Sequence, residues 1–284
     1  MFFMNQTVFN RWANETRQIR ENIIKMIHQC ASGHPGGSLS CVEILYALFA
    51  KDGVMQHSPD KLNSFERDRF ILSKGHGVPA LYAILHAVGY DITDSELMTL
   101  RHLGSRLQGH PDRVRLPYIE ASTGSLGQGA SIAQGIAMSY KLDKNPHRVY
   151  ALIGDGEMQE GQIWEVASSA VHHKLGNFTL ILDYNKAQID GTVKEVLNMD
   201  PPEKRWEAFG WNTLVINGHK YDEIVKALQT THPTKPTMII AHTIKGKGVS
   251  FMENNIVGWH GSAPNDEQCK QAVQEIQNNQ SIGL

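Results

Sequence analysis

Residues 149–191 contain the stretch that decides the fold, VYALIGDGEMQEGQIWEVASSAVHHKLGNFTLILDYNKAQIDG. Its apolar, β-forming runs at 149–153 and 178–182 predict two buried strands. Between them, the Gly-Asp-Gly turn at 154–156 precedes a polar–apolar pattern that predicts a helix from about Gln159 to His173. A strand, a helix and a strand in this order form a βαβ unit, which requires a parallel sheet. We therefore predict an α/β fold with a central parallel sheet and helices on both faces.

Two polar residues follow these strands directly. Asp155 ends the first strand, and Asn185 comes thirty positions later, after the second. Ligands of parallel sheets bind at the carboxyl ends of the strands, where both side chains would meet. A carboxylate and an amide oxygen suit Mg²⁺, and the glycines beside Asp155 let the backbone approach a diphosphate closely. The alternative is that Gly-Asp-Gly is only a tight turn and that Asn185 caps the next loop.

Four histidines stand beside glycines or prolines in predicted loops. They are His34 in SGHPGG, His76 in SKGHG, His110 in QGHPD and His260 in WHG. Such neighbours leave the imidazole open to a ligand, although a single loop histidine is more often only solvated. The segment STGSLGQG at 122–129 opens a small-residue helix, whose N-terminal amides can meet a ligand or whose small residues only pack against another helix.

The remaining pattern completes the predicted sheet. Strands are predicted at 69–72, 211–216 and 237–242, and helices at 8–30, 40–49, 130–140, 222–231 and 267–278. Residues 32–37 are predicted as a loop because Pro35 blocks helix continuation, and 200–202 as a linker. The basic segment IKGKG at 244–248 follows the last strand, where such a segment is usually a solvated turn. Residues 89–120 show little periodicity and are predicted as an excursion around the site.

Composition bounds the class of protein. The chain has 284 residues, 27 basic against 29 acidic, so its charge favours neither nucleic acid nor an anionic membrane as partner. The cysteines Cys30, Cys41 and Cys269 lack metal or redox spacing and fit a reducing cytosol. The sequence shows neither a signal-peptide pattern nor a run long enough to span a membrane. We expect one domain over residues 1–284 and a cytoplasmic location.

The motifs together carry a family resemblance. SGHPGGSLS, LSKGHG, LGSRLQGHPD, STGSLGQG, GDGEMQEGQIWEVASSA, DYNKAQIDG, IKGKG and WHG occur in the order typical of transketolases. Along nearly its whole length the chain resembles the N-terminal, diphosphate-binding half of that family. The resemblance implies the thiamine-diphosphate-binding fold, with thiamine diphosphate and Mg²⁺ as cofactors and Ca²⁺ or Mn²⁺ as possible substitutes for Mg²⁺.

The resemblance also implies a role for each matching residue. The metal would be held by Asp155, Asn185 and the backbone carbonyl of Ala187, where many relatives have a larger apolar residue. Cofactor contacts would come from His76, Gly124, Ser125, Leu126, Gly156, Lys245 and His260. His34, His110 and His260 would face the sugar substrate, and Lys245 could serve the cofactor, the substrate or both. Glu160 and Glu165 match acidic residues at the family's subunit interface.

The implied activity is transfer of a two-carbon ketol unit from a ketose phosphate to an aldose or aldose phosphate. Complete transketolases are about twice as long, so we expect a separate C-terminal subunit with the pyrimidine-binding and C-terminal domains, and an α₂β₂ assembly. Pentose phosphates are the default sugars, and a branched or sulfonated catabolic sugar is the alternative. A different thiamine enzyme, such as 1-deoxyxylulose-phosphate synthase or a 2-oxoacid dehydrogenase subunit, and a non-catalytic binding module remain as further alternatives.

Overall fold

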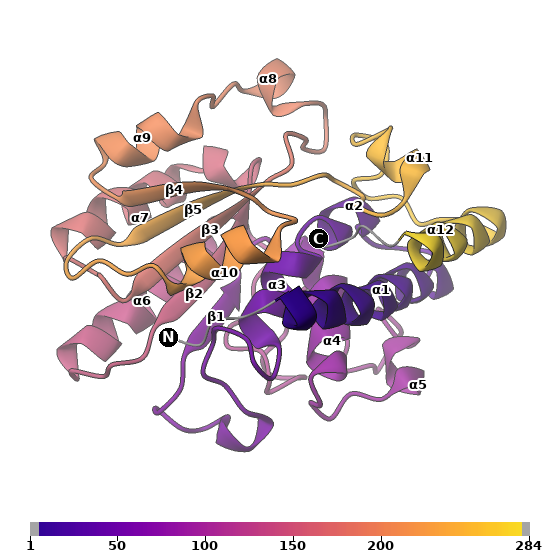
Figure 1. Cartoon of the computed structure of the whole chain (residues 1–284), viewed down its shortest axis with the longest axis horizontal. Helices are drawn as coiled ribbons and strands as arrows, with labels where there is room; N and C mark the ends of the chain where they lie inside the picture. The colour runs from indigo at the N-terminus through magenta and orange to yellow at the C-terminus, as the bar shows by residue number, and fades with distance from the viewer. Residues whose placement is uncertain (1–5, 280–284) are drawn as a thin grey trace.

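A five-stranded parallel sheet forms the centre of the molecule (Figure 1). The computed structural model describes residues 6–279. The strands are β1 (Arg69–Leu72), β2 (Val149–Gly154), β3 (Phe178–Tyr184), β4 (Asn212–Asn217) and β5 (Thr237–His242), in the spatial order β1-β2-β3-β5-β4. Gly154 of β2 is level with Asp183 of β3, which is level with Ala241 of β5. The central strands therefore end together, and the loops that follow them meet at one edge.

Helices cover both faces of the sheet, as predicted (Figure 1). The helices are α1 (Gln6–Gln29), α2 (Pro35–Leu39), α3 (Val42–Phe49), α4 (Val78–Ala87), α5 (Asp94–Leu97), α6 (Gln128–Leu142), α7 (Gly161–His172), α8 (Val193–Val196), α9 (Pro202–Ala208), α10 (Tyr221–Gln229), α11 (Ser250–Glu253) and α12 (Asp266–Asn278). Short 3₁₀ turns occur at η1 (Pro59–Lys61), η2 (Gly75–Gly77) and η3 (Glu157–Gln159). One apolar core includes α1, α3, α4 and α10, and a second includes α6, α7 and α9.

The alternation of side chains along β2 shows how one strand supplies both cores. Tyr150 and Leu152 belong to the first core, whereas Val149, Ala151 and Ile153 belong to the second. Successive residues of a strand point to opposite faces, so a strand covered on both faces is apolar at every position. This explains why the sequence run VYALI predicts a buried strand without period-two alternation. The α/β prediction is confirmed.

Two local predictions were wrong at proline positions. Pro35 does not keep its segment in a loop but begins α2, and Pro202 begins α9 where a linker was predicted. Proline is favourable in the first helical turn because the missing N–H has no helical partner there. The helix predicted from about Gln159 to His173 is α7, which begins at Gly161 after the 3₁₀ turn η3. The strands at 69–72 and 237–242 were predicted with their observed bounds.

Two global features of residues 6–279 bear on the class of protein. No helix in this part of the chain is both long and apolar enough to cross a membrane. Cys30, Cys41 and Cys269 are free thiols.

Candidate active site at the carboxyl edge of the sheet

A cleft of about 350 Å³ opens where β1, β2, β3 and β5 end. This size suits a small organic ligand, for which pockets of about 300–1,000 Å³ are usual. The cleft is lined by His34, Gly37, Lys74, His76, His110, Gly124, Leu126, Gly154, Asp155, Gly156, Glu157, Gln159, Glu160, Asn185, Ala187, Gln188, Ile189, Asp190, Lys245 and His260. Every residue predicted for metal, cofactor or sugar is among them except Ser125, which is exposed. The fold thus brings together residues from nearly the whole chain.

The predicted metal ligands follow the ends of the neighbouring strands β2 and β3. Asp155 is 2% exposed, and its Oδ2 accepts a hydrogen bond from the backbone N–H of Lys186 at 2.5 Å. Asn185 is also buried, and its Oδ1 accepts from the N–H of Ala187 at 3.3 Å. Burial, and then the negative charge of Asp183, raises the pKa of Asp155 to about 7. A raised pKa means that the positive charge near Asp155 is too small to offset the cost of burying its ionised carboxylate.

Residues 6–279 contain no cluster of three or more His, Cys, Asp and Glu side chains that could hold a metal ion. The predicted ligand set is of another kind, because it has a single carboxylate, one amide oxygen and one backbone carbonyl. These oxygen donors match Mg²⁺, which usually keeps water and phosphate oxygens as further ligands.

Lys245 is buried against the same site. Its Nζ lies 2.8 Å from Nδ1 of His260 and 3.4 Å from the carbonyl oxygen of Ala187. Burial lowers the pKa of Lys245 to about 8, although Asp155 opposes this shift. An ammonium can only donate, so Nδ1 of His260 accepts and the ring proton stays on Nε2.

Four imidazoles converge on the cleft. The ring centroid of His34 lies 5.3 Å from that of His76, 5.5 Å from that of His260 and 6.4 Å from that of His110. Burial, followed by nearby positive charges, lowers the pKa of His34 to about 4 and that of His260 to about 3. It also lowers the pKa of His76 and His110. These rings are therefore neutral near pH 7 and can both donate and accept protons.

Two observations indicate space prepared for a polar ligand. Nδ1 of His34 is buried without a hydrogen-bond partner in the described part of the chain. Gly124 has φ of +150°, and a Cβ there would lie 3.2 Å from the ring of His110. A larger residue at this position would be strained and would crowd the imidazole.

Backbone contacts hold the loops of the cleft against one another. The N–H of Gly36 donates to the carbonyl of Trp259 at 3.1 Å, and the N–H of Gly246 donates to the carbonyl of Gly36 at 3.0 Å. A Cβ on Gly36 would lie only 2.7 Å from the oxygen of Trp259. Glycine is therefore required where the loop of His34 meets those of Lys245 and His260.

Sequence reasoning missed several charged residues of the site. Lys74 and Asp183 form a buried ion pair behind the cleft. The carboxylate of Glu157 accepts from the backbone N–H of Gly127 at 2.9 Å and of Gly154 at 3.1 Å. Arg101 donates to the hydroxyl of Ser32 at 3.0 Å beside the histidine loops. Lys74 and Glu157 lie within the motifs SKGHG (73–77) and GDGE (154–157), and this position was the sequence signal available for them.

The predicted interface residues lie away from the centre of the cleft. Glu160 is the exposed N-cap residue of α7 at the rim, and Glu165 is exposed on the same helix. Their positions leave them available to another chain, and their role stays a prediction.

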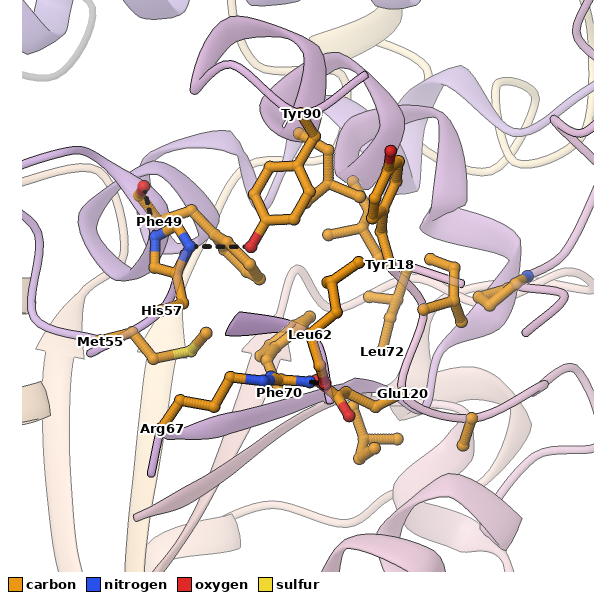
Figure 2. Close-up of a pocket in the computed structure, with 16 residues that line it drawn as sticks. Phe49, Met55, His57, Leu62, Arg67, Phe70, Leu72, Tyr90, Tyr118 and Glu120 are labelled. Atoms are coloured by element: carbon orange, nitrogen blue, oxygen red, sulfur yellow. Dashed lines mark hydrogen bonds and ion pairs between the residues drawn. The ribbon is translucent and has the colours of Figure 1, made fainter. Parts of the chain in front are cut away.

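A second hollow is a small cavity beside β1 (Figure 2). Its volume is about 20 Å³, room for about one water molecule. His57 bonds to the carbonyl of Phe49 at 2.8 Å and to the hydroxyl of Tyr90 at 2.9 Å, so both ring nitrogens have partners. Arg67, at the amino end of β1, pairs with Glu120. This cavity is too small for a cofactor and shares no lining residue with the cleft.

Comparison with known proteins defines the class. Residues 12–281 match the family described as transketolase, thiamine diphosphate binding domain. A solved transketolase from Campylobacter jejuni superposes with a TM-score of 0.86 and 36% identity, covering 98% of this chain and 44% of that one. The fold is thus that of a thiamine-diphosphate-binding domain. The chain belongs to the transketolase family, a family of transferases.

Relatives of two lengths are found. The chain is 42% identical over 267 residues to one of the subunits of the apulose-4-phosphate transketolase of Phocaeicola vulgatus, covering 92% of each. It is 43% identical over 266 residues to the 6-deoxy-6-sulfo-D-fructose transketolase subunit SqwG of a Clostridium species, covering 93% of this chain and 95% of that one. Human transketolase is 38% identical over 261 residues, but only 41% of its length is covered. The recognition of a transketolase N-terminal subunit is confirmed.

Proposed function

We propose that this chain is one folding domain that supplies the diphosphate-binding half of a two-chain, Mg²⁺-dependent transketolase. A separate subunit would carry the pyrimidine-binding and C-terminal domains, with two copies of each chain in the assembly. The observation that carries the proposal is the cleft in which Asp155, Asn185, Lys245 and four histidines meet at the carboxyl edge of the sheet. The relatives named as subunits have matching length, which supports a separate partner.

The residues present fit a hard cation. Asp155, Asn185 and the carbonyl of Ala187 would hold Mg²⁺, and the cation would supply the positive charge that the buried Asp155 carboxylate lacks. Ca²⁺ or Mn²⁺ also prefers oxygen donors and could replace it. Glu160 and Glu165 would contact another subunit across the exposed start of α7.

The cleft also fits the organic cofactor. Gly156 and Gly124 keep the walls open, while His76, Ser125, Leu126, Lys245 and His260 would contact the diphosphate end or the ring. Thiamine diphosphate supplies the carbanion chemistry needed to cleave and form carbon–carbon bonds.

The histidines of this chain would bind and deprotonate sugar hydroxyls. Because Nδ1 of His260 accepts from Lys245, its Nε2–H remains to donate to a sugar oxygen. The free Nδ1 of His34 can accept a hydroxyl proton, and His110 stands at the exposed side where the sugar chain would extend. Their neutral state suits general acid–base catalysis near pH 7.

A ketose phosphate would act as donor and an aldose or its phosphate as acceptor. The two subunit relatives are named for apulose 4-phosphate and for 6-deoxy-6-sulfo-D-fructose. This observation favours a branched or sulfonated sugar, and pentose phosphates form the second class to test. The free thiols fit action in the reducing cytoplasm.

Reconstitution tests the proposal. The chain alone should show no ketol transfer, and adding the partner subunit with thiamine diphosphate and Mg²⁺ should create it against a panel of branched, sulfonated and pentose-derived ketoses. Light scattering should show the mass of an α₂β₂ assembly. Full transketolase turnover by the purified chain alone would overturn the two-subunit proposal.

A further inference from the structure

A buried carboxylate lies directly behind the proposed cation site. Asp183 is 0% exposed and precedes Asn185 by two positions. Its Oδ2 accepts from the hydroxyl of Ser40 at 2.6 Å and from Nδ2 of Asn185 at 3.4 Å. Its Oδ1 accepts from the hydroxyl of Thr243, and Lys74 completes an ion pair with Oδ2. One carboxylate therefore joins segments that follow α2, β1, β3 and β5.

Lys74 balances this carboxylate from the neighbouring strand end. Its side chain is 1% exposed, and its Nζ donates to the carbonyl of Gly37 at 2.7 Å as well as to Asp183. Two buried carboxylates, Asp155 and Asp183, otherwise stand close to the same site. The ammonium of Lys74 neutralises one of them and leaves the other free for a cation.

The orientation of Asn185 depends on the same carboxylate at its NH₂ end and on the N–H of Ala187, which donates to its Oδ1 at 3.3 Å. The two ends of a carboxamide have nearly the same shape, so its orientation is set by the hydrogen bonds that each end can make. An ionised carboxylate only accepts, so Asp183 can bond only to the NH₂ end of Asn185. The oxygen of Asn185 is then held away from Asp183, where a cation can meet it.

We propose that Asp183 and Lys74 are positioning residues for the cation. Asp183 fixes the orientation of the Asn185 carboxamide, and Lys74 neutralises the negative charge of Asp183. The inference rests on the proposed function, since it needs Mg²⁺ bound at Asp155 and Asn185. A structural pair would only stabilise the fold. A positioning pair also sets the affinity for the metal, and groups behind metal ligands commonly change it by about 10–100-fold.

The first experiment separates these roles with Lys74→Met/Asp183→Leu. Apolar residues of similar volume often replace a buried ion pair without loss of stability. We expect unfolding in urea with EDTA close to that of the wild-type chain, but Mg²⁺-dependent binding of thiamine diphosphate weakened about tenfold or more by calorimetry. Wild-type affinity in this folded variant would overturn the proposal.

A second pair of variants covers the case in which that protein does not fold. Asp183→Asn keeps the shape but offers both a donor and an acceptor to Asn185, so the Mg²⁺ affinity should fall. Adding Asn185→Asp supplies a ligand that presents oxygen in either orientation, so the affinity should largely return. The proposal would be overturned if Asp183→Asn bound Mg²⁺ as tightly as the wild type. It would also be overturned if Asp183→Asn/Asn185→Asp recovered none of the Mg²⁺ affinity.

A matched control comes from the partly buried charges beside β1 (Figure 2). Glu120 pairs with Arg67 and, at 2.9 Å, with Arg69, at the opposite edge of the sheet. Glu120→Gln should lower stability and leave the Mg²⁺ affinity unchanged. The wild-type chain and its reconstituted complex are titrated first with Mg²⁺ and thiamine diphosphate. If the wild-type chain and the complex bind neither Mg²⁺ nor thiamine diphosphate, the proposed function fails and this inference fails with it. If the wild type binds both and the Asp183 and Lys74 variants bind equally well, only the inference fails.

Discussion

The buried carboxylate of Asp155 should make the cation-free chain less stable than a neutral variant. Burial, and then the charge of Asp183, raises its pKa from 3.8 to about 7. The folded chain therefore holds this proton more tightly than the unfolded chain, and stability falls as the pH rises through this interval. Asp155→Asn removes the charge and keeps an oxygen for the N–H of Lys186. We expect it to stabilise the chain in EDTA and to abolish Mg²⁺ binding.

The size of the effect follows from the two pKa values. Their separation corresponds to at most about 4 kcal/mol once the pH is above the folded value. Relaxation around the charge reduces this, so we expect a gain of about 2 kcal/mol or more, or about 4–8 °C in Tm. The gain should become small at about pH 4, where the folded state holds the proton and the unfolded state holds it part of the time.

Urea and thermal unfolding at about pH 4 and about pH 8, each with EDTA, measure the prediction. Added Mg²⁺ and thiamine diphosphate should stabilise the wild-type chain and leave the variant unchanged. Asp190→Asn is the matched control, because Asp190 lines the same cleft but is exposed and should affect stability little. No stabilisation of Asp155→Asn at the higher pH, or an equal gain at both pH values, would refute the reasoning.

Three further changes test other parts of the site. His260→Ala should lower turnover of the reconstituted enzyme about tenfold or more with little change in Tm, and wild-type turnover on every donor would contradict its role. Burial and then Arg101 lower the pKa of His34 from 6.5 to about 4, so the unfolded chain takes up this proton more readily than the folded chain. The stability of the fold should therefore decrease as the pH falls from 6.5 to about 4. His34→Asn should flatten this dependence in urea titrations, and an unchanged slope would count against it. Glu160→Lys/Glu165→Lys should reduce the mass of the assembly in light scattering, and an unaltered mass would argue against an interface at α7.

The centre of the sheet was predictable because β2 and β3 are buried along their whole length and carry apolar runs. The β2 run Val149–Gly154 and the β5 run Thr237–His242 therefore stand out from the polar loops that follow them. Helix starts were harder to predict. Pro35 and Pro202 stop a preceding helix and also begin a new one, and the sequence pattern does not distinguish the two uses.

The cleft was predictable at its glycine-flanked histidines and at Asp155 and Asn185, because those positions combine chemistry with a strand end. Asp183 was not, because it lies inside a strand and its partners Ser40, Lys74 and Thr243 come from distant segments. A buried charge is recognisable only when its partner is known, and the partner is a tertiary contact. The network behind the site therefore required the structure.

The histidine cluster can form only late in the synthesis of the chain, because its members come from distant segments. His34 and His260 lie 5.5 Å apart between ring centroids although most of the sequence separates them. Parallel sheets depend on contacts between distant segments, which form slowly during folding. A ribosome-bound chain lacks Lys245 and His260 until residues 245–260 have emerged, well after His34, so the cofactor contacts of these residues form late. We therefore expect thiamine diphosphate to bind after the segments that carry His34, Lys245 and His260 have come together.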